Sequence, residues 1–138
     1  MPLKTTTLIT AGQGNGSHAP VKLADAVPRV RIRIGGRKLG PGKADLLDAI
    51  GRTASLTAAG AEQGMSPRRA RLLVDELNQM FTRPAVAAGD ESSDTAELTQ
   101  FGRELVAAYR RLEARTRAAM LEELASFEPE LAPGKPAT

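Results

Sequence analysis

Residues 55–67 read SLTAAGAEQGMSP and carry the strongest local signal in the chain. Ser55 or Thr57 can cap the start of a short helix, because a hydroxyl can accept a hydrogen bond from a free backbone N–H there. Gly64 can adopt a positive φ at the end of that helix without steric cost. Gly60 is small enough for a second helix to cross closely. We therefore predict two helices joined by a tight turn.

The second helix is expected to begin at Ser66 and Pro67 and to run to about Phe81. Ser66 suits the N-cap, and Pro67 suits the first position because its missing N–H has no intrahelical partner there. Apolar residues recur at helical spacing on one face of this segment, namely Ala70, Leu73, Val74, Leu77, Met80 and Phe81.

The opposite face of the second helix is polar and basic at its N-terminal end. With Ala70 facing inward and 3.6 residues per turn, the outward residues are Arg68, Leu72, Asp75 and Gln79, with Arg69 and Arg71 on the flanks. Arginines oppose the helix dipole at an N-terminus, yet their guanidinium groups suit phosphate and the O6/N7 edge of guanine. The pattern favours DNA recognition, and a solvated basic face is the alternative.

The flanking segments predict a small domain around these two helices. Residues 30–34 alternate apolar and basic, as a strand does, and Gly35-Gly36 ends it. A helix is expected from Pro41 to about Arg52, with an apolar stripe of Leu46, Leu47 and Ile50. After the second helix, 84–88 and 96–99 predict a hairpin around a polar tip at 89–95.

Thr99 can cap a last, long helix that extends to about Phe127. This order of elements predicts a mainly α fold with a small β-hairpin wing, a winged helix-turn-helix with a long C-terminal dimerisation helix. The last helix would extend about 40 Å, more than the preceding domain can cover, so a second copy is expected against it. The predicted dimer interface consists of Leu105, Ala108, Tyr109, Leu112, Met120 and Leu124.

Composition excludes several classes of function. The chain has 138 residues, no cysteine and one histidine, His18, which we interpret as a solvated tail residue. Disulfides, Cys-ligated metal sites and His-based catalysis are therefore not expected, nor is a cofactor. Aromatic residues make up 3% of the chain, too few for a platform that stacks single-stranded nucleic acid.

Charge is distributed unevenly along the chain. Overall the net charge is +3, but residues 29–52 carry +5 and residues 84–99 carry −4. A basic surface suits a polyanionic partner. Plausible phosphate contacts from the loop that leads into the helix expected at Pro41 are Arg37, Lys38 and Lys43. The acidic tip of the predicted wing would be repelled by a phosphate backbone.

Four regions are expected along the chain. They are a flexible N-terminal arm at 1–28, a winged helix-turn-helix domain at 29–99, the dimerisation helix at 100–127 and a flexible tail at 128–138. No stretch approaches the roughly 20 apolar residues of a membrane span, and no signal peptide is recognisable. A cytoplasmic location and no membrane partner are expected.

Several motifs together resemble the N-terminal DNA-binding domain of ModE-type molybdate-responsive regulators, over about residues 29–127. They are LGPGK at 39–43, ASLTAA at 54–59, GMS at 64–66, RRA at 68–70, LLVDELN at 72–78 and LTQFG at 98–102. The resemblance implies a LysR-like winged helix-turn-helix dimer of bacterial type that binds palindromic operator DNA.

Three departures from the family pattern alter this expectation. The chain ends soon after the long helix, so the molybdate-binding portion of the family is not expected and molybdate sensing cannot be carried over. Ser66-Pro67 and Ala70-Arg71 stand where the family often has Ser-Tyr and Ala-Trp, which should change the bases that are read. The wing is acidic where the family's is typically glycine-rich.

The sequence thus predicts a non-enzymatic transcriptional regulator, a homodimer on double-stranded DNA, with an effector or sensor partner left open. The expected DNA contacts are Ser66, Pro67, Arg68, Arg69, Arg71, Leu72, Thr57, Lys43 and Arg37. One alternative is a protein-interaction module that has kept the fold and lost DNA binding. Another, an enzyme that binds a divalent cation through Asp90, Glu91 and Asp94, is disfavoured because the spacing does not match a calcium loop.

Overall fold

The computed structural model describes residues 20–90 and 92–134. His18 and Glu91 lie outside these residues, so the expectations about them are not addressed. The described chain forms two compact units. One comprises Pro28–Thr116, and the other joins the segment up to Val27 with the residues from Arg117 onward.

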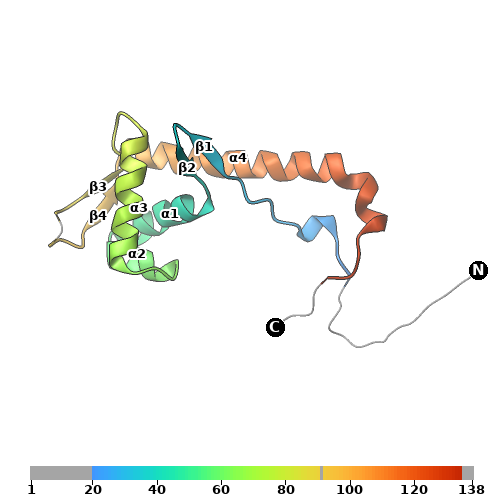
Figure 1. The fold of residues 1–138 in the computed structure, drawn as a ribbon, viewed down its shortest axis with the longest axis horizontal. Helices are drawn as coiled ribbons and strands as arrows, with labels where there is room; N and C mark the ends of the chain where they lie inside the picture. Colours follow the sequence, from blue (N-terminus) through green and yellow to red (C-terminus); the bar gives the residue numbers. More distant parts are fainter. Residues whose placement is uncertain (1–19, 91, 135–138) are drawn as a thin grey trace, which may run out of the picture. The chain divides into compact units, whose positions relative to one another are not determined.

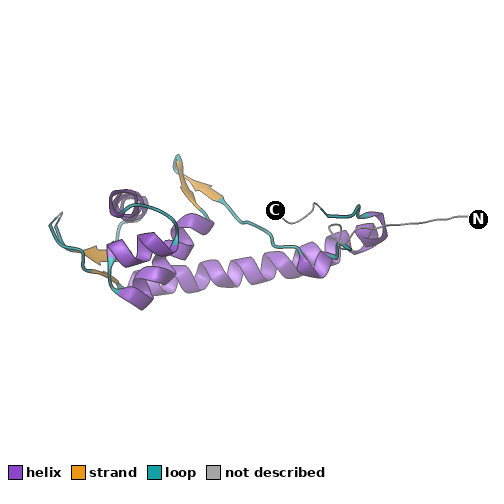
Figure 2. Cartoon of the chain, turned by 90° about the horizontal axis from the view of Figure 1, so that it is seen from below, coloured by secondary structure: helices purple, strands orange, loops and turns teal. Residues whose placement is uncertain are grey.

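The unit Pro28–Thr116 confirms the mainly helical prediction with two small antiparallel sheets (Figures 1 and 2). Its elements are β1 (Ile32–Ile34), β2 (Arg37–Leu39), α1 (Pro41–Thr53), α2 (Leu56–Glu62), α3 (Pro67–Met80), β3 (Val86–Ala88), β4 (Ala96–Leu98) and the first part of α4 (Gln100–Leu124). This is the winged helix-turn-helix order, with β3–β4 as the wing.

The region before α1 differs from the prediction of a single strand ended by glycines. The chain turns at Gly35-Gly36 and returns as β2, pairing Ile34 with Arg37 and Ile32 with Leu39. Both glycines have positive φ, 56° and 82°, which is the requirement of a two-residue type I′ hairpin turn. The glycines therefore connect two strands, and we call β1–β2 the basic hairpin.

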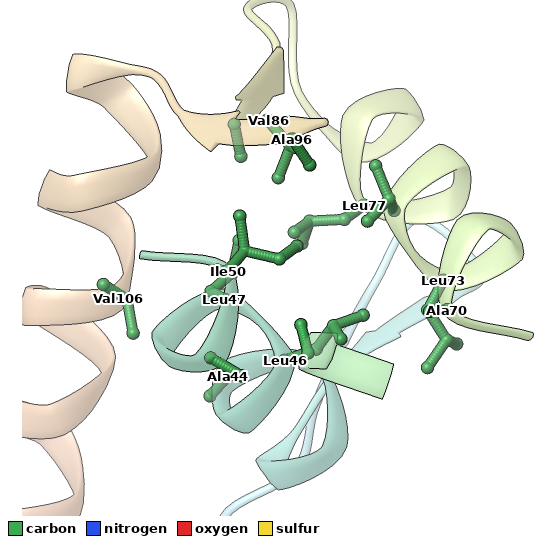
Figure 3. Close-up of a cluster of buried hydrophobic side chains, with 14 of the residues drawn as sticks. Ala44, Leu46, Leu47, Ile50, Ala70, Leu73, Leu77, Val86, Ala96 and Val106 are labelled. Atoms are coloured by element: carbon green, nitrogen blue, oxygen red, sulfur yellow. The ribbon is translucent and has the colours of Figure 1, made fainter. Parts of the chain in front are cut away.

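The core of this unit lies between α1, α3 and the start of α4 (Figure 3). The predicted stripes are confirmed, since Leu46, Leu47 and Ile50 of α1 and the inward residues of α3 from Ala70 to Leu77 are buried. From α4, the buried residues are Gly102, Val106 and Tyr109. Val106 is not among the apolar residues singled out on this helix from the sequence, but it lies one turn from Gly102 and shares the face of Gly102 and Tyr109.

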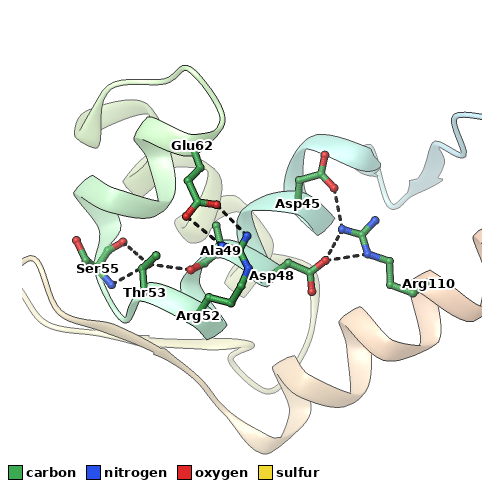
Figure 4. A network of polar contacts seen from close by, with 8 residues as sticks. All are labelled: Asp45, Asp48, Ala49, Arg52, Thr53, Ser55, Glu62 and Arg110. Atoms are coloured by element: carbon green, nitrogen blue, oxygen red, sulfur yellow. Dashed lines mark hydrogen bonds and ion pairs between the residues drawn. The ribbon is translucent and has the colours of Figure 1, made fainter.

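Polar contacts fix α4 against α1 (Figure 4). The Arg110 guanidinium donates to Asp45 at 2.7 Å and to Asp48 at 2.9 Å, and it pairs with Glu113 at 2.9 Å. Partial burial lowers the pKa of Arg110, but the hydrogen bonds to Asp45, Glu113 and Asp48 outweigh this effect and raise its pKa above the usual value. The side chain is therefore a permanent cation that joins the two helices.

The second unit contains short helical segments from both of its parts of the chain. A 3₁₀ helix spans Leu23–Asp25, and α4 continues into a 3₁₀ helix at Ala125–Glu130, past the predicted end at Phe127. The Leu23 N–H donates to Glu128 Oε1 at 3.2 Å, and the Leu23 side chain is buried. Apolar burial and this hydrogen bond order the segments here.

Candidate nucleic-acid interface

The joint between α2 and α3 has the geometry that the sequence predicts. A Cβ at Gly60 would lie 3.1 Å from Ala70 Cβ and 3.2 Å from the Met65 carbonyl oxygen, so a larger residue would push the helices apart. Gly64 has a φ of +70°, which an L-residue adopts at a cost. The joint thus fixes the angle at which α3 leaves the domain.

Side-chain caps define where both helices begin. Ser55 Oγ accepts from the Ala58 N–H at 3.0 Å, and Ser66 Oγ accepts from the Arg69 N–H at 3.1 Å. Pro67 is the first residue of α3. Both caps confirm the predicted starts of the two helices. The first three residues of α3 are exposed.

Helix α3 lies between the two hairpins in both views (Figures 1 and 2). Arg68 and Arg69 are exposed, and neither has a carboxylate within ion-pair distance among the described residues. Leu72, on the same side, is 48% exposed, which is high for a leucine. The helix therefore presents two unpaired cations and an apolar side chain to solvent.

Arg71 has a different environment from its two neighbours. Its guanidinium donates to three wing carbonyls, those of Gly89 at 3.2 Å, Asp90 at 3.1 Å and Ser93 at 3.0 Å. The sequence placed this residue on the flank of the DNA-facing side, but it could not reveal partners 18 to 22 residues away. In the structure, Arg71 holds the wing to α3.

Asp94 attaches the wing to α2 in a similar way. Its carboxylate accepts hydrogen bonds from the Ser55 hydroxyl, the Thr57 hydroxyl at 2.6 Å and the Thr57 N–H at 2.8 Å. These bonds, the one from Ser55 first, lower the pKa of Asp94. Thr57, which the sequence placed among the DNA contacts, is thus engaged within the domain.

Lys43 and Arg37, the two contacts expected before α3, differ in availability. The Lys43 side chain is 10% exposed, and its ammonium lies 3.2 Å from Glu76 and 2.7 Å from the Lys38 carbonyl oxygen. Arg37 is exposed and donates to Gln79 of α3 at 3.4 Å. Lys43 therefore serves mainly to join α1 to α3, whereas Arg37 stays at the surface.

The predicted dimer residues of α4 separate into two groups. Tyr109 is 3% exposed, and its hydroxyl donates to the Val30 carbonyl within the same chain; burial raises its pKa. Leu105 packs against the same core. These two residues stabilise the domain itself, while Ala108, Leu112 and Leu124 are exposed and Met120 is half-buried.

The acidic wing tip is used internally where the structure describes it. Asp90 Oδ1 accepts from the Ser92 N–H at 3.0 Å and from the Ser92 hydroxyl at 2.6 Å, which lowers the pKa of Asp90.

Within residues 20–90 and 92–134, no group of three or more His, Cys, Asp or Glu side chains is arranged around a common metal position. Over the same residues, no helix combines the length and apolar character needed to cross a membrane.

Comparison with known proteins gives distant relatives. The molybdenum-pterin-binding protein MopB of Rhodobacter capsulatus is 38% identical over 98 residues, which are 70% of this chain and 35% of that protein. MopA of the same organism is 34% identical over 83 residues, 59% of this chain and 31% of its own. The chain spans about a third of the length of these relatives, and no protein-family model matches it.

Proposed function

We propose that this chain is a DNA-binding transcriptional regulator without enzymatic activity. The observation that carries the proposal is the first turn of α3, where Arg68 and Arg69 are exposed and have no ion-pair partner within the described part of the chain. Gly60 and Gly64 fix the angle of this helix. A helix of this kind enters the major groove with its N-terminal residues against base edges.

The roles of the residues follow from their chemistry. Arg68 and Arg69 can contact guanine or phosphate with their forked donors. Leu72 can pack against a thymine methyl group, which an apolar side chain recognises. The Ser66 hydroxyl accepts from the helix, and its own O–H remains able to donate to a phosphate.

The proposed active form is a homodimer on a palindromic operator. Ala108, Leu112 and Leu124 are exposed apolar residues on α4, and a second copy would remove them from water. Two recognition helices related by a two-fold axis read half-sites about one helical turn apart. The similarity to two molybdenum-pterin-binding proteins supports a role in molybdenum-related gene control.

The test is selection of bound fragments from genomic DNA, with and without molybdate, by the wild-type chain and by the Arg68→Ala/Arg69→Ala variant. We expect the wild type to enrich a two-fold-symmetric site and the variant to lose it, because each bidentate arginine contributes roughly 1–3 kcal/mol of discrimination. The control is Arg103→Ala/Arg111→Ala on α4, which removes the same charge from exposed residues off the Ala108–Leu112 stripe. A folded Arg68→Ala/Arg69→Ala variant with unchanged enrichment would contradict the assignment.

A protein-interaction module on the same scaffold is the second candidate, and the acidic wing favours it. The wing and its borders carry Asp90, Asp94 and Glu97. Arg71 donates its hydrogen bonds to wing carbonyls, so it is not available for DNA. Salt separates the candidates, since DNA binding releases counterions and must weaken steeply as salt rises. Little salt dependence, or no binding to duplex DNA at all, would favour the interaction module.

A further inference from the structure

The basic hairpin β1–β2 is a second projection beside α3, on the side opposite the wing (Figures 1 and 2). Strand β2 packs against α3, and the Arg37 guanidinium donates to Gln79 at 3.4 Å. Between hairpin and helix lies an open groove lined by Arg31, Arg37 and Lys38 on one side and by Arg69, Glu76 and Gln79 on the other, so that five of its residues, counting Lys43, are cations and one is a carboxylate. The hairpin and the recognition helix thus share one continuous surface.

The charged residues of this hairpin and of the segments beside it are all positive. Residues 29–43 contain six cations and no carboxylate. Among the described residues, Lys43 alone of these six has an ion-pair partner, Glu76. Arg29, Arg31, Arg33, Arg37 and Lys38 are exposed. This surface therefore keeps a concentrated positive charge that the rest of the unit does not neutralise.

Two of the cations face each other directly. Arg33 pairs with Lys38 across the hairpin, on the face opposite Ile32 and Leu39. Like charges at directly opposed positions destabilise a two-stranded sheet, so this pair is unfavourable for folding alone. A polyanion lying along that face would remove the repulsion.

The geometry of DNA relates the two hairpins to the two strands. A helix in the major groove, about 12 Å wide, has a sugar–phosphate backbone on each side. The wing on one side of α3 is acidic and held by Arg71 and Asp94, while the hairpin on the other side is basic and forms no ion pair with any residue that the structure describes. The hairpin side of α3 should therefore attract phosphates, whereas the wing side should repel them.

We infer that the basic hairpin is the phosphate-binding wing of this protein, with Arg33 and Lys38 contacting the DNA backbone beside α3, in place of the acidic β3–β4 wing. The inference rests on the proposed DNA binding and adds a surface that the helix-turn-helix by itself does not provide. Its contacts are to phosphate, so they strengthen binding to any duplex sequence.

The test compares wild type with Arg33→Gln/Lys38→Gln, using fluorescence anisotropy on a mixed-sequence duplex of about 30 base pairs across a salt series. The control Arg103→Gln/Arg111→Gln removes the same charge from two exposed arginines of α4 that lie off the Ala108–Leu112 stripe. We expect the hairpin variant to bind roughly tenfold to a hundredfold more weakly at 0.1 M salt, with its log–log salt slope reduced by about two. The control should bind like wild type, with an unchanged sedimentation profile.

The outcomes distinguish this inference from the proposed function. Wild type that does not bind duplex DNA would overturn both. Wild type that binds, an Arg68→Ala/Arg69→Ala variant that does not, and a hairpin variant indistinguishable from the control would overturn the inference alone. The thermal midpoint of the hairpin variant shows whether it is folded. Removing two like charges that face each other should leave this midpoint equal to that of wild type or above it. Weaker binding by a variant with a retained midpoint therefore supports the inference.

Discussion

At the scale of single residues, Gly102 and Gly42 show how the position of a glycine in a helix decides whether its substitution by alanine destabilises the fold. A Cβ at Gly102 in α4 would lie 2.0 Å from the Ala85 carbonyl oxygen, a distance at which backbone must move. Gly42 in α1 is exposed, and a Cβ there would meet no atom within 4 Å. The same substitution should therefore have opposite consequences.

We expect Gly102→Ala to lower the free energy of unfolding by about 1–3 kcal/mol, because overpacking forces the backbone at Ala85, just before β3, away from α4. Gly42→Ala should raise it by up to about 1 kcal/mol, since alanine restricts the unfolded chain and favours helix. Urea denaturation of both variants measures the difference. A Gly102→Ala variant as stable as Gly42→Ala would show that α4 does not approach Ala85 this closely.

At the scale of elements, the wing is fixed both by packing, since Val86 and Ala96 belong to the core, and by hydrogen bonds to its neighbours. Asp94 binds the start of α2, and Arg71 binds the wing from α3. The hydrogen bonds from Ser55 and Thr57 hold the pKa of Asp94 below its ordinary value. A carboxylate with a lowered folded-state pKa stabilises the fold above its unfolded pKa, and this contribution disappears as the pH falls through the folded pKa.

Asp94→Asn should therefore be less stable than wild type at about pH 7, and the two proteins should converge as the pH falls below the usual range for aspartate, about 3.9. The amide cannot accept as strongly, and its own N–H groups conflict with the donors of Ser55 and Thr57. Denaturation at a series of pH values gives the two curves. Parallel curves over the whole range would mean that Asp94 is not the titrating group.

At the scale of the whole molecule, association through α4 makes a prediction about oligomeric state. Leu112 is 38% exposed and belongs to the apolar residues left outside the core. In a two-fold dimer each copy contributes the same residue, so a substitution acts twice.

Leu112→Glu should weaken the dimer by about tenfold or more, because the exposed part of each leucine contributes only a fraction of the roughly 1.5–3 kcal/mol of full burial, and the substitution acts in both copies. Ala107→Glu, also exposed on α4 but about a quarter turn from the Ala108–Leu112 stripe, is the matched control. Sedimentation velocity over a concentration series measures both. If Leu112→Glu and Ala107→Glu associate alike, α4 is not the dimer interface.

Local patterns in the sequence were sufficient for the helices, their caps and the joint at Gly60 and Gly64. These features depend on residues a few positions apart, whose backbone preferences and apolar spacing are legible in one dimension. The polarised charge was equally legible, as was the exposed arginine pair at the start of α3. The return strand β2 is absent from the sequence prediction, because Gly35-Gly36 fits the end of a strand as well as a hairpin turn, and only the structure shows that both adopt positive φ.

The tertiary structure decided which of the predicted contact residues remain available. Arg71, Thr57, Lys43 and Tyr109 are engaged by groups 18 to 79 residues away or on another element. Such partners depend on how elements pack, and hydrogen-bond geometry over a few ångströms is not encoded in spacing along the chain. The sequence by itself therefore determined the scaffold and the location of its positive charge. Packing determined which cations are consumed within the fold and which, on α3 and the basic hairpin, remain free to meet a polyanion.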